Sequence, residues 1–172
     1  ALTACAQPTE DQPWVTYEAS EGPGNGRHIV FVSGDEEYRS EEALPMLAKI
    51  MAVRHGFRST VLFPIDPETG HINPNYQRNI PGLHQLADAD LMVLFTRFRD
   101  LPEDQMEHIV DFINAGKPIV ALRTSTHGFQ FPEDDPYRKY TWNNDQGAWQ
   151  GGFGRRILGE TWVNHHGAHR EE

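Results

Sequence analysis

Three stretches of the sequence gather charged and polar side chains that could bind or transform a ligand. They read SGDEEYRSEE at residues 33–42, TRFRD at 96–100 and RTSTH at 123–127. An arginine guanidinium is a planar fork of N–H donors that suits a carboxylate, a phosphate or a polyol. These stretches therefore predict a site for an oxygen-rich ligand, although we expect either Arg97 or Arg99 to serve in a salt bridge instead. The candidate ligand-binding residues are Asp35, Glu36, Tyr38, Arg39, Arg97, Arg99 and Arg123.

The stretch at 123–127 also contains a hydroxyl group and an imidazole. A serine becomes a nucleophile only when a base lies within hydrogen-bond reach. Ser125 and His127 are two residues apart, and closeness in sequence does not establish that geometry. We therefore expect a binding turn rather than a nucleophile. His127 is a candidate for catalytic proton transfer because an imidazole titrates near neutral pH, and a structural histidine is the alternative.

A second group of candidates is the histidine cluster NHHGAH at 164–169. His165 or His166, taken with His169, has the spacing of two metal ligands on one helix face. Gly167 weakens a helix there, and no acidic residue precedes the cluster at the spacing of a metalloenzyme motif. Three interpretations stay open: a divalent metal bound by His165, His166 and His169, a sugar contact or acid–base role for His165, and a structural role.

Short apolar runs alternate with amphipathic stretches along the chain. The runs at 28–33, 57–63, 91–96 and 118–122 are apolar enough for buried strands. Apolar residues spaced for one helix face follow the first run, and Gly56 lies just past the expected helix end. A second helix is expected after Asp100 and Glu103, which resemble a capping box, and it is expected to stop at Gly116.

This alternation predicts a single flavodoxin-like α/β domain, with helices on both faces of a doubly wound parallel sheet. Ligands in such folds bind beyond the carboxyl ends of the strands, where the three polar stretches would meet. We expect Arg123 to follow a buried central strand and to face the same cleft as His127. A buried guanidinium needs a carboxylate partner, for which Asp35, Glu36 and Glu37 are the candidates.

Composition and charge limit the classes of partner. The 172 residues are enough for one domain with a sizeable core. The net charge of −10 disfavours nucleic acid, because phosphate binding requires a basic face. No apolar run approaches the roughly 18 residues that are needed to span a membrane.

The polar residues 1–26 are expected to form a tether that precedes the folded domain at 27–172. Cys5 is the single cysteine, which excludes an internal disulfide. Its context LTAC has the form of a bacterial lipobox, and the printed sequence would then begin inside a signal peptide. We expect a protein on the periplasmic side of the bacterial cell envelope, lipid-anchored through Cys5. Simple export, for which ACA fits a cleavage pattern, and a chance tetrapeptide are the alternatives.

Four ordered motifs resemble the trehalose-utilisation, or ThuA-like, family, and especially its exported bacterial members. They read VSGDEEYRSEEALP, FTRFRDLP, GKPIVALRTSTHGF and GGFGRRILGETWVNHHG, and the resemblance extends from about residue 27 to 169. It implies a fold similar to class I glutamine amidotransferases and a role near sugar catabolism, often beside oxidoreductases that make 3-keto sugars. It also implies a domain that continues past the printed residues, with a fifth strand there. An amidotransferase would carry a cysteine after the fourth strand, where this chain has Arg123-Thr124-Ser125.

Two functions are therefore expected. One is an exported protein that binds or processes a carbohydrate, with arginines orienting the ligand and His127 or His165 handling protons. Aromatic residues late in the chain could stack on a sugar ring or cover the core. These are Trp142, Trp149, Phe153 and Trp162. The alternative is a lipid-anchored, non-catalytic accessory subunit of a larger membrane complex. An open pocket with convergent arginines at the carboxyl ends of the strands would favour the first function. Close packing of the side chains there, with no open pocket, would favour the second.

Overall fold

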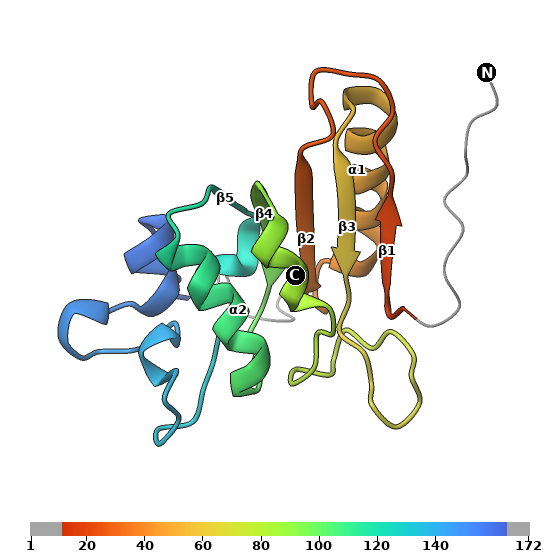
Figure 1. Ribbon diagram of the computed structural model, residues 1–172. Helices are drawn as coiled ribbons and strands as arrows, with labels where there is room; N and C mark the ends of the chain where they lie inside the picture. Colours follow the sequence, from red (N-terminus) through yellow and green to blue (C-terminus); the bar gives the residue numbers. More distant parts are fainter. Residues whose placement is uncertain (1–11, 165–172) are drawn as a thin grey trace, which may run out of the picture.

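The computed structural model describes residues 12–164, which form a five-stranded sheet with helices on both faces (Figure 1). The strands are β1 (Trp14–Tyr17), β2 (His28–Gly34), β3 (Arg58–Leu62), β4 (Leu91–Thr96) and β5 (Ile119–Ala121). The α-helices are α1 (Ser40–His55) and α2 (Glu103–Asn114). Shorter helical turns are η1 (Leu83–Asp88), η2 (Arg123–His127), η3 (Arg138–Tyr140), η4 (Gly147–Trp149) and η5 (Gly154–Leu158). The predicted α/β class is confirmed.

The sheet is mixed rather than purely parallel. Its order is β1-β3-β2-β4-β5, and β1 runs antiparallel to β3 while the other neighbours are parallel. Trp14 lies opposite Leu62, and the Thr16 and Thr60 hydroxyls are 3.1 Å apart. The predictions of a parallel sheet and of a tether through residue 26 were therefore wrong at this edge. Trp, Val, Thr and Tyr all favour strands, but the run is short and polar residues surround it.

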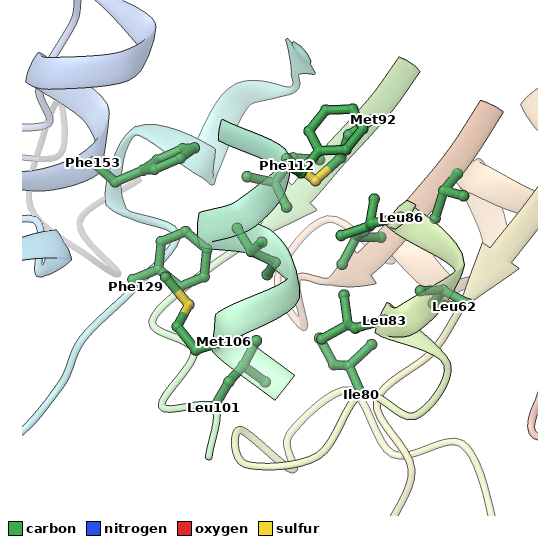
Figure 2. Packing of buried hydrophobic residues seen from close by; sticks show 14 of the residues in the cluster. Leu62, Ile80, Leu83, Leu86, Met92, Leu101, Met106, Phe112, Phe129 and Phe153 are labelled. Atoms are coloured by element: carbon green, nitrogen blue, oxygen red, sulfur yellow. The ribbon is translucent and has the colours of Figure 1, made fainter. Parts of the chain in front are cut away.

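Each face of the sheet has its own hydrophobic core, because alternate residues of a strand point to opposite faces. From β2, Val30 and Val32 enter the first core, which α2 and η1 cover. Ile29 and Phe31 enter the second core, where they meet Leu44 of α1. Figure 2 shows the first core with Leu62, Ile80, Leu83, Leu86, Met92, Leu101, Met106, Phe112, Phe129 and Phe153 labelled.

β5 ends the described sheet on the side opposite β1. Its residues are only partly covered, and Val120 exposes 47% of its surface. All seven residues of β2 are buried, by contrast. Within residues 12–164, the strand before Arg123 is the last of the sheet and is only partly buried, so this part of the chain does not give Arg123 the buried central strand that we expected.

The helix ends agree with the sequence signals in part. Gly56 follows α1 in the left-handed conformation, with φ of 71°, as its position predicts. α2 begins at Glu103 directly after Pro102. The expected capping box is not formed, because no side chain caps this end of α2. Asp100 instead makes an ion pair of 3.3 Å with Arg78.

Candidate functional site

The three polar stretches singled out in the sequence meet at the carboxyl edge of the parallel strands. The Arg97 N–H donates to the Gly34 carbonyl at 2.9 Å. The Phe98 N–H donates to the His127 carbonyl at 3.0 Å, so the loop after β4 is bonded to the loops on both of its sides. Side chains from all three loops are thereby brought within reach of one another.

The carboxylate of Asp35 organises the loop after β2. Its Oδ1 accepts the backbone N–H groups of Glu37 (2.8 Å) and Tyr38 (2.6 Å). Its Oδ2 accepts the hydroxyl of Thr124, which belongs to η2. The Ser40 hydroxyl at the start of α1 accepts the Asp35 N–H at 2.8 Å. Asp35 is fully buried, so its oxygens fasten this loop to η2 rather than face solvent.

Glu36 pairs with both arginines of the loop after β4. Its Oε1 accepts a hydrogen bond from Arg97 Nη1, and its Oε2 accepts one from Arg99 Nη2 at 2.9 Å. Arg97 Nε also lies 3.2 Å from Glu37 Oε2. These ion pairs bridge the loops after β2 and β4, the two neighbouring strands at the centre of the sheet.

Arg99 is fully buried and donates to oxygen atoms on several sides. Its Nε donates to the Arg97 carbonyl at 2.8 Å. Its Nη1 donates to the carbonyls of Pro74 (3.0 Å) and Tyr76 (3.2 Å). Burial lowers the pKa of the Arg99 guanidinium to about 10, which Glu36 opposes, so the group stays charged at neutral pH. Arg99 thus cross-links the surrounding loops.

Arg123 is exposed and pairs with a tyrosine. Its Nη2 donates to the Tyr38 hydroxyl at 2.7 Å, and its guanidinium carbon lies 4.1 Å from the centre of the Tyr38 ring. The expected carboxylate partner was wrong: an exposed guanidinium needs no buried counter-charge, and the loop after β2 supplies a cation–π contact instead. Arg39 is also largely exposed and pairs with Glu42 of α1.

The Ser125 hydroxyl is directed at the backbone of β4. It donates to the Leu94 carbonyl at 2.9 Å and accepts the Thr96 N–H at 3.2 Å. Ser125 is fully buried. Its single proton therefore holds η2 against the end of β4 and is not directed at an imidazole.

Four aromatic rings gather beside these loops, and we call them the aromatic cluster: Phe98, His127, Trp142 and Trp162. The ring centres of His127 and Trp162 are 4.7 Å apart, and those of Phe98 and His127 are 5.0 Å apart. Trp142 lies 4.6 Å from Trp162 and 6.2 Å from Phe98. His127 is buried, whereas the other three rings are partly exposed. The buried Trp142 Nε1–H has no hydrogen-bond acceptor among residues 12–164.

The other two aromatic candidates cover the core. Phe153 is buried in the first core, with its ring centre 5.1 Å from that of Phe129. Trp149 packs edge-on against Tyr140 at 4.6 Å. The structure therefore divides the four late aromatic candidates: Trp142 and Trp162 belong to the aromatic cluster, Phe153 lies in the first core, and the partly buried Trp149 packs against that core.

Strained backbone is concentrated at the same edge of the sheet. Four non-glycine residues in the described part of the chain have positive φ, and three of them belong to these loops. They are Arg39 (54°), Phe98 (50°) and Arg123 (33°). A side chain in this region costs on the order of 1 kcal/mol or more, and such strain often accompanies a binding site.

Two hollows lie near this edge. One, of about 380 Å³, is lined by Phe98 and Asp100 among others, and burial raises the pKa of the Asp100 carboxyl. The other, of about 610 Å³, runs beside β5 and reaches Arg123. Arg97 and Arg99 line neither hollow, because both are engaged with Glu36.

Several predicted residues lie outside the described residues: Cys5, His165, His166 and His169. Their lipid, metal and acid–base roles stay predictions. Within residues 12–164, no group of three or more His, Cys, Asp or Glu side chains is arranged to hold a metal ion. No helix in that part of the chain is long and apolar enough to cross a membrane.

Sequence reasoning did not single out Phe98 and Thr124. The signal that could have found Phe98 is its position as the one aromatic residue in the polar stretch TRFRD, between two arginines. Nothing in the sequence distinguishes Thr124, whose hydroxyl reaches Asp35 only because the two loops meet in space.

Comparison of the chain with protein-family models, with curated proteins and with solved structures gave no match.

Proposed function

We propose that this chain is a flavodoxin-like domain that binds a carbohydrate at the aromatic cluster. The strand order supports the fold: with β1 set aside, the parallel strands lie in the order second, first, third, fourth along the chain. That is the order of flavodoxin-like sheets, whose ligands bind where the first and third parallel strands adjoin. Here those strands are β2 and β4, and Phe98 belongs to the loop that follows β4.

The aromatic cluster carries the proposal. Partly exposed aromatic faces pack well against the apolar face of a sugar ring, and an indole N–H normally finds a hydrogen-bond partner when it is buried. The Trp142 Nε1–H has no acceptor among residues 12–164, so a ligand hydroxyl could accept it. His127 adds an imidazole beneath Trp162 that could exchange a proton with the same ligand.

In this proposal the arginines position the site instead of binding the ligand directly. Arg97 and Arg99 fix the strained Phe98 from both sides by their bonds to Glu36. The resemblance to the ThuA-like family supports sugars, including keto sugars, as the ligand class. We further propose that the protein acts on the periplasmic side of a bacterial cell envelope, anchored through Cys5.

The proposal is tested by calorimetric titration with trehalose, glucose and a 3-keto glucoside. Trp142→Phe keeps an aromatic ring but removes the N–H donor together with part of the indole surface, and Trp162→Ala removes a stacking face. Each should weaken binding by about tenfold, which corresponds to roughly 1.4 kcal/mol. Trp149→Phe is the matched control, because Trp149 packs against Tyr140, and it should bind as the unaltered chain does. If none of the sugars binds, or if the control loses as much affinity as the two variants, the cluster is not a carbohydrate site.

A second candidate is a non-catalytic accessory subunit of a larger membrane complex. The observation that favours it is the set of ion pairs between the loops after β2 and β4, in which Glu36 uses one carboxylate oxygen for Arg97 and the other for Arg99. Native electrophoresis of detergent-solubilised membranes separates the two functions. An accessory subunit would migrate with a large assembly in the unaltered and Trp162→Ala forms alike, and neither form would bind the sugars.

A further inference from the structure

The smaller of the two hollows at the carboxyl edge lies against the aromatic cluster. Phe98 belongs to both, because its ring centre is 5.0 Å from that of His127 and the same residue lines the hollow of about 380 Å³. Arg97 helps to hold the Phe98 ring in place, since its guanidinium carbon lies 4.6 Å from the ring centre. The cluster and the hollow are therefore adjacent places on one surface that share Phe98.

The walls of this hollow come from three parts of the chain that are bonded to one another. They are Gln77 of the β3–β4 connection, Phe98 and Asp100 of the loop after β4, and residues 130–132, which follow η2. The Asp100 N–H donates to the Gln77 carbonyl at 3.1 Å, and the Gln130 N–H donates to the Arg99 carbonyl at 2.9 Å. The walls are thus held in place by backbone bonds within residues 12–164.

Three side chains bring unengaged hydrogen-bonding groups to the hollow. Asp100 Oδ2 lies 3.3 Å from Arg78 Nη1, whereas Asp100 Oδ1 has no partner among residues 12–164. The side-chain amides of Gln77 and Gln130 likewise bond to no group in that part of the chain. A primary amide donates and accepts hydrogen bonds, a carboxylate accepts them, and a sugar hydroxyl does both. The three side chains therefore match a ligand that carries several hydroxyl groups.

Apolar surface lies beside these polar groups. Phe131 is 4% exposed, Phe98 is partly exposed, and Pro132 completes this part of the lining. The apolar face of a sugar ring packs on aromatic surface of this kind, while its hydroxyls point outward to polar groups around it. Proteins bind small molecules in pockets of roughly 300–1,000 Å³, and this hollow of about 380 Å³ is at the small end of that range. The hollow therefore suits a single sugar ring.

The charges at the hollow favour a neutral sugar over an acidic one. Burial raises the pKa of the Asp100 carboxyl, and the negative charge of Asp135 acts in the same direction. The nearby cation is Arg78, which is already paired with Asp100, and no lysine or arginine of residues 12–164 lines the hollow. A phosphate or a carboxylate on the ligand would therefore meet two acidic side chains without a free cation to offset them.

We propose that this hollow is a second sugar subsite, and that the ligand is a neutral disaccharide with one ring at the aromatic cluster and the other in the hollow. Phe98 contacts both rings. Asp100 Oδ1 and the amides of Gln77 and Gln130 bind hydroxyls of the second ring. This inference rests on the proposed function, because it extends the ligand of the aromatic cluster, and it adds the size and the charge of that ligand.

Side-chain N–H signals in proton–nitrogen correlation spectra of the full chain report on the two places separately. The probes are glucose and the neutral disaccharides maltose, cellobiose and trehalose. The Trp142 indole signal should shift with glucose and with at least one disaccharide, whereas the Gln77 and Gln130 amide signals should shift with that disaccharide alone. A Trp142 signal that moves with no sugar would overturn the proposed function. A Trp142 signal that moves while the glutamine signals stay fixed, or move equally with glucose, would overturn the second subsite and leave carbohydrate binding at the cluster standing.

Gln130→Ala tests the subsite through affinity, measured by calorimetric titration. The Gln130 side chain is exposed and bonds to no group among residues 12–164, so the variant should fold as the unaltered chain does. It should weaken binding of the responding disaccharide by about fivefold to tenfold and change glucose binding by less than about twofold. Gln150→Ala is the matched control, because Gln150 is an exposed glutamine that lines neither hollow, and it should change neither affinity.

A phosphate ester of the same disaccharide tests the charge preference. It should bind the unaltered chain about tenfold more weakly than the neutral disaccharide does, because its charge meets Asp100 and Asp135. Equal losses of glucose and disaccharide affinity in Gln130→Ala, or a phosphate ester that binds as tightly as the neutral disaccharide, would overturn the proposal.

Discussion

The Arg99 guanidinium sits among oxygen atoms that come from three parts of the chain. It bonds to Glu36 in the loop after β2, to the Arg97 carbonyl in its own loop, and to the carbonyls of Pro74 and Tyr76 in the long β3–β4 connection. Burying a charge is costly unless every side of it is hydrogen-bonded. Arg99 meets that condition, so its removal affects several loops together.

We expect Arg99→Ala to lower the free energy of unfolding by about 3–5 kcal/mol, because it leaves Glu36 with one partner and three carbonyls without the Arg99 donor. Arg97→Ala, in the same loop but partly exposed, should cost distinctly less. Urea denaturation of both variants measures the difference. Equal losses would show that burial of Arg99 is not the source of its effect.

Arg123 should behave differently, because it is exposed and its partner is a tyrosine. Arg123→Ala should change the free energy of unfolding by no more than about 1 kcal/mol. Arg123→Gly loses the same contact with Tyr38 but relaxes the positive φ, so it should be more stable than Arg123→Ala by roughly 0.5–1 kcal/mol. A thermal-unfolding series of the two variants checks the order, which would be reversed if the backbone were unstrained.

His28 gives the fold a dependence on pH. It is buried, its Nε2 lies 2.9 Å from the Thr60 hydroxyl, and burial together with nearby Arg58 lowers its pKa to about 4. The unfolded chain takes up a proton near pH 6.5 while the folded chain stays neutral. Stability is therefore fully present above that pH and falls as the pH drops toward 4. The loss from this group should reach roughly 2–3 kcal/mol at pH 4.

Denaturant titrations at pH 7, 6, 5 and 4 measure this loss, and His28→Gln is the control because its amide does not titrate. The variant should lose less stability over the window than the unaltered chain, although acidic residues affect both. Parallel pH profiles for the two proteins would exclude His28 as the cause.

At the scale of elements, apolar runs in the sequence were sufficient to locate β2, β3, β4 and both helices. The run at 118–122 also located β5, but no run located β1, and the position of β5 in the sheet was not predicted. β1 has four residues within a polar segment, and its position depends on pairing with β3 rather than on any pattern of its own. The run before Arg123 is apolar, but a run of that kind does not reveal whether its strand is central or at an edge. Side-chain partners such as Tyr38 for Arg123 depend on loop geometry, which residue type alone does not determine.

The contribution of β1 can be measured through Trp14. Its ring lies against Gly82, where an added Cβ would come within 2.7 Å of the indole, and it meets His84 edge-on at 5.5 Å. Trp14→Ala should cost about 2–3 kcal/mol, below the value for a fully buried tryptophan because the ring is partly exposed. Thr16→Ala, in the same strand but with a smaller contact, should cost less than about 1 kcal/mol. A loss for Trp14→Ala as small as that for Thr16→Ala would mean that β1 adds little to the fold.

At the scale of the whole molecule, two cores share one sheet. The first lies under α2 and η1 and the second under α1, and β2 contributes side chains to both. Loss of either core removes support from the same strands. We therefore expect residues 12–164 to unfold as one cooperative unit.

Leu44→Ala in the second core and Ile109→Ala in the first should each cost about 2–5 kcal/mol, because both side chains are fully buried. Each variant should shift one common transition to lower temperature. Far-ultraviolet circular dichroism follows the helices on both faces, and tryptophan fluorescence follows mainly the first-core side and the carboxyl edge. Separate transitions from the two probes in either variant would show that the cores unfold independently.

The direction of β1 also determines which edge of the sheet faces a membrane or a resin when the protein is attached through its N-terminal residues. Because β1 is antiparallel to β3 and Trp14 pairs with Leu62, the strand begins at the carboxyl edge of the sheet, where the aromatic cluster lies. The nine residue steps from Cys5 to Trp14 span at most about 30 Å. A bilayer that received a lipid on Cys5, or a resin that captured an N-terminal tag, would therefore lie on the side of the candidate site. An assay on immobilised protein would then report restricted access to that edge, whereas attachment through an introduced surface cysteine on the solvent face of α1 would leave it open.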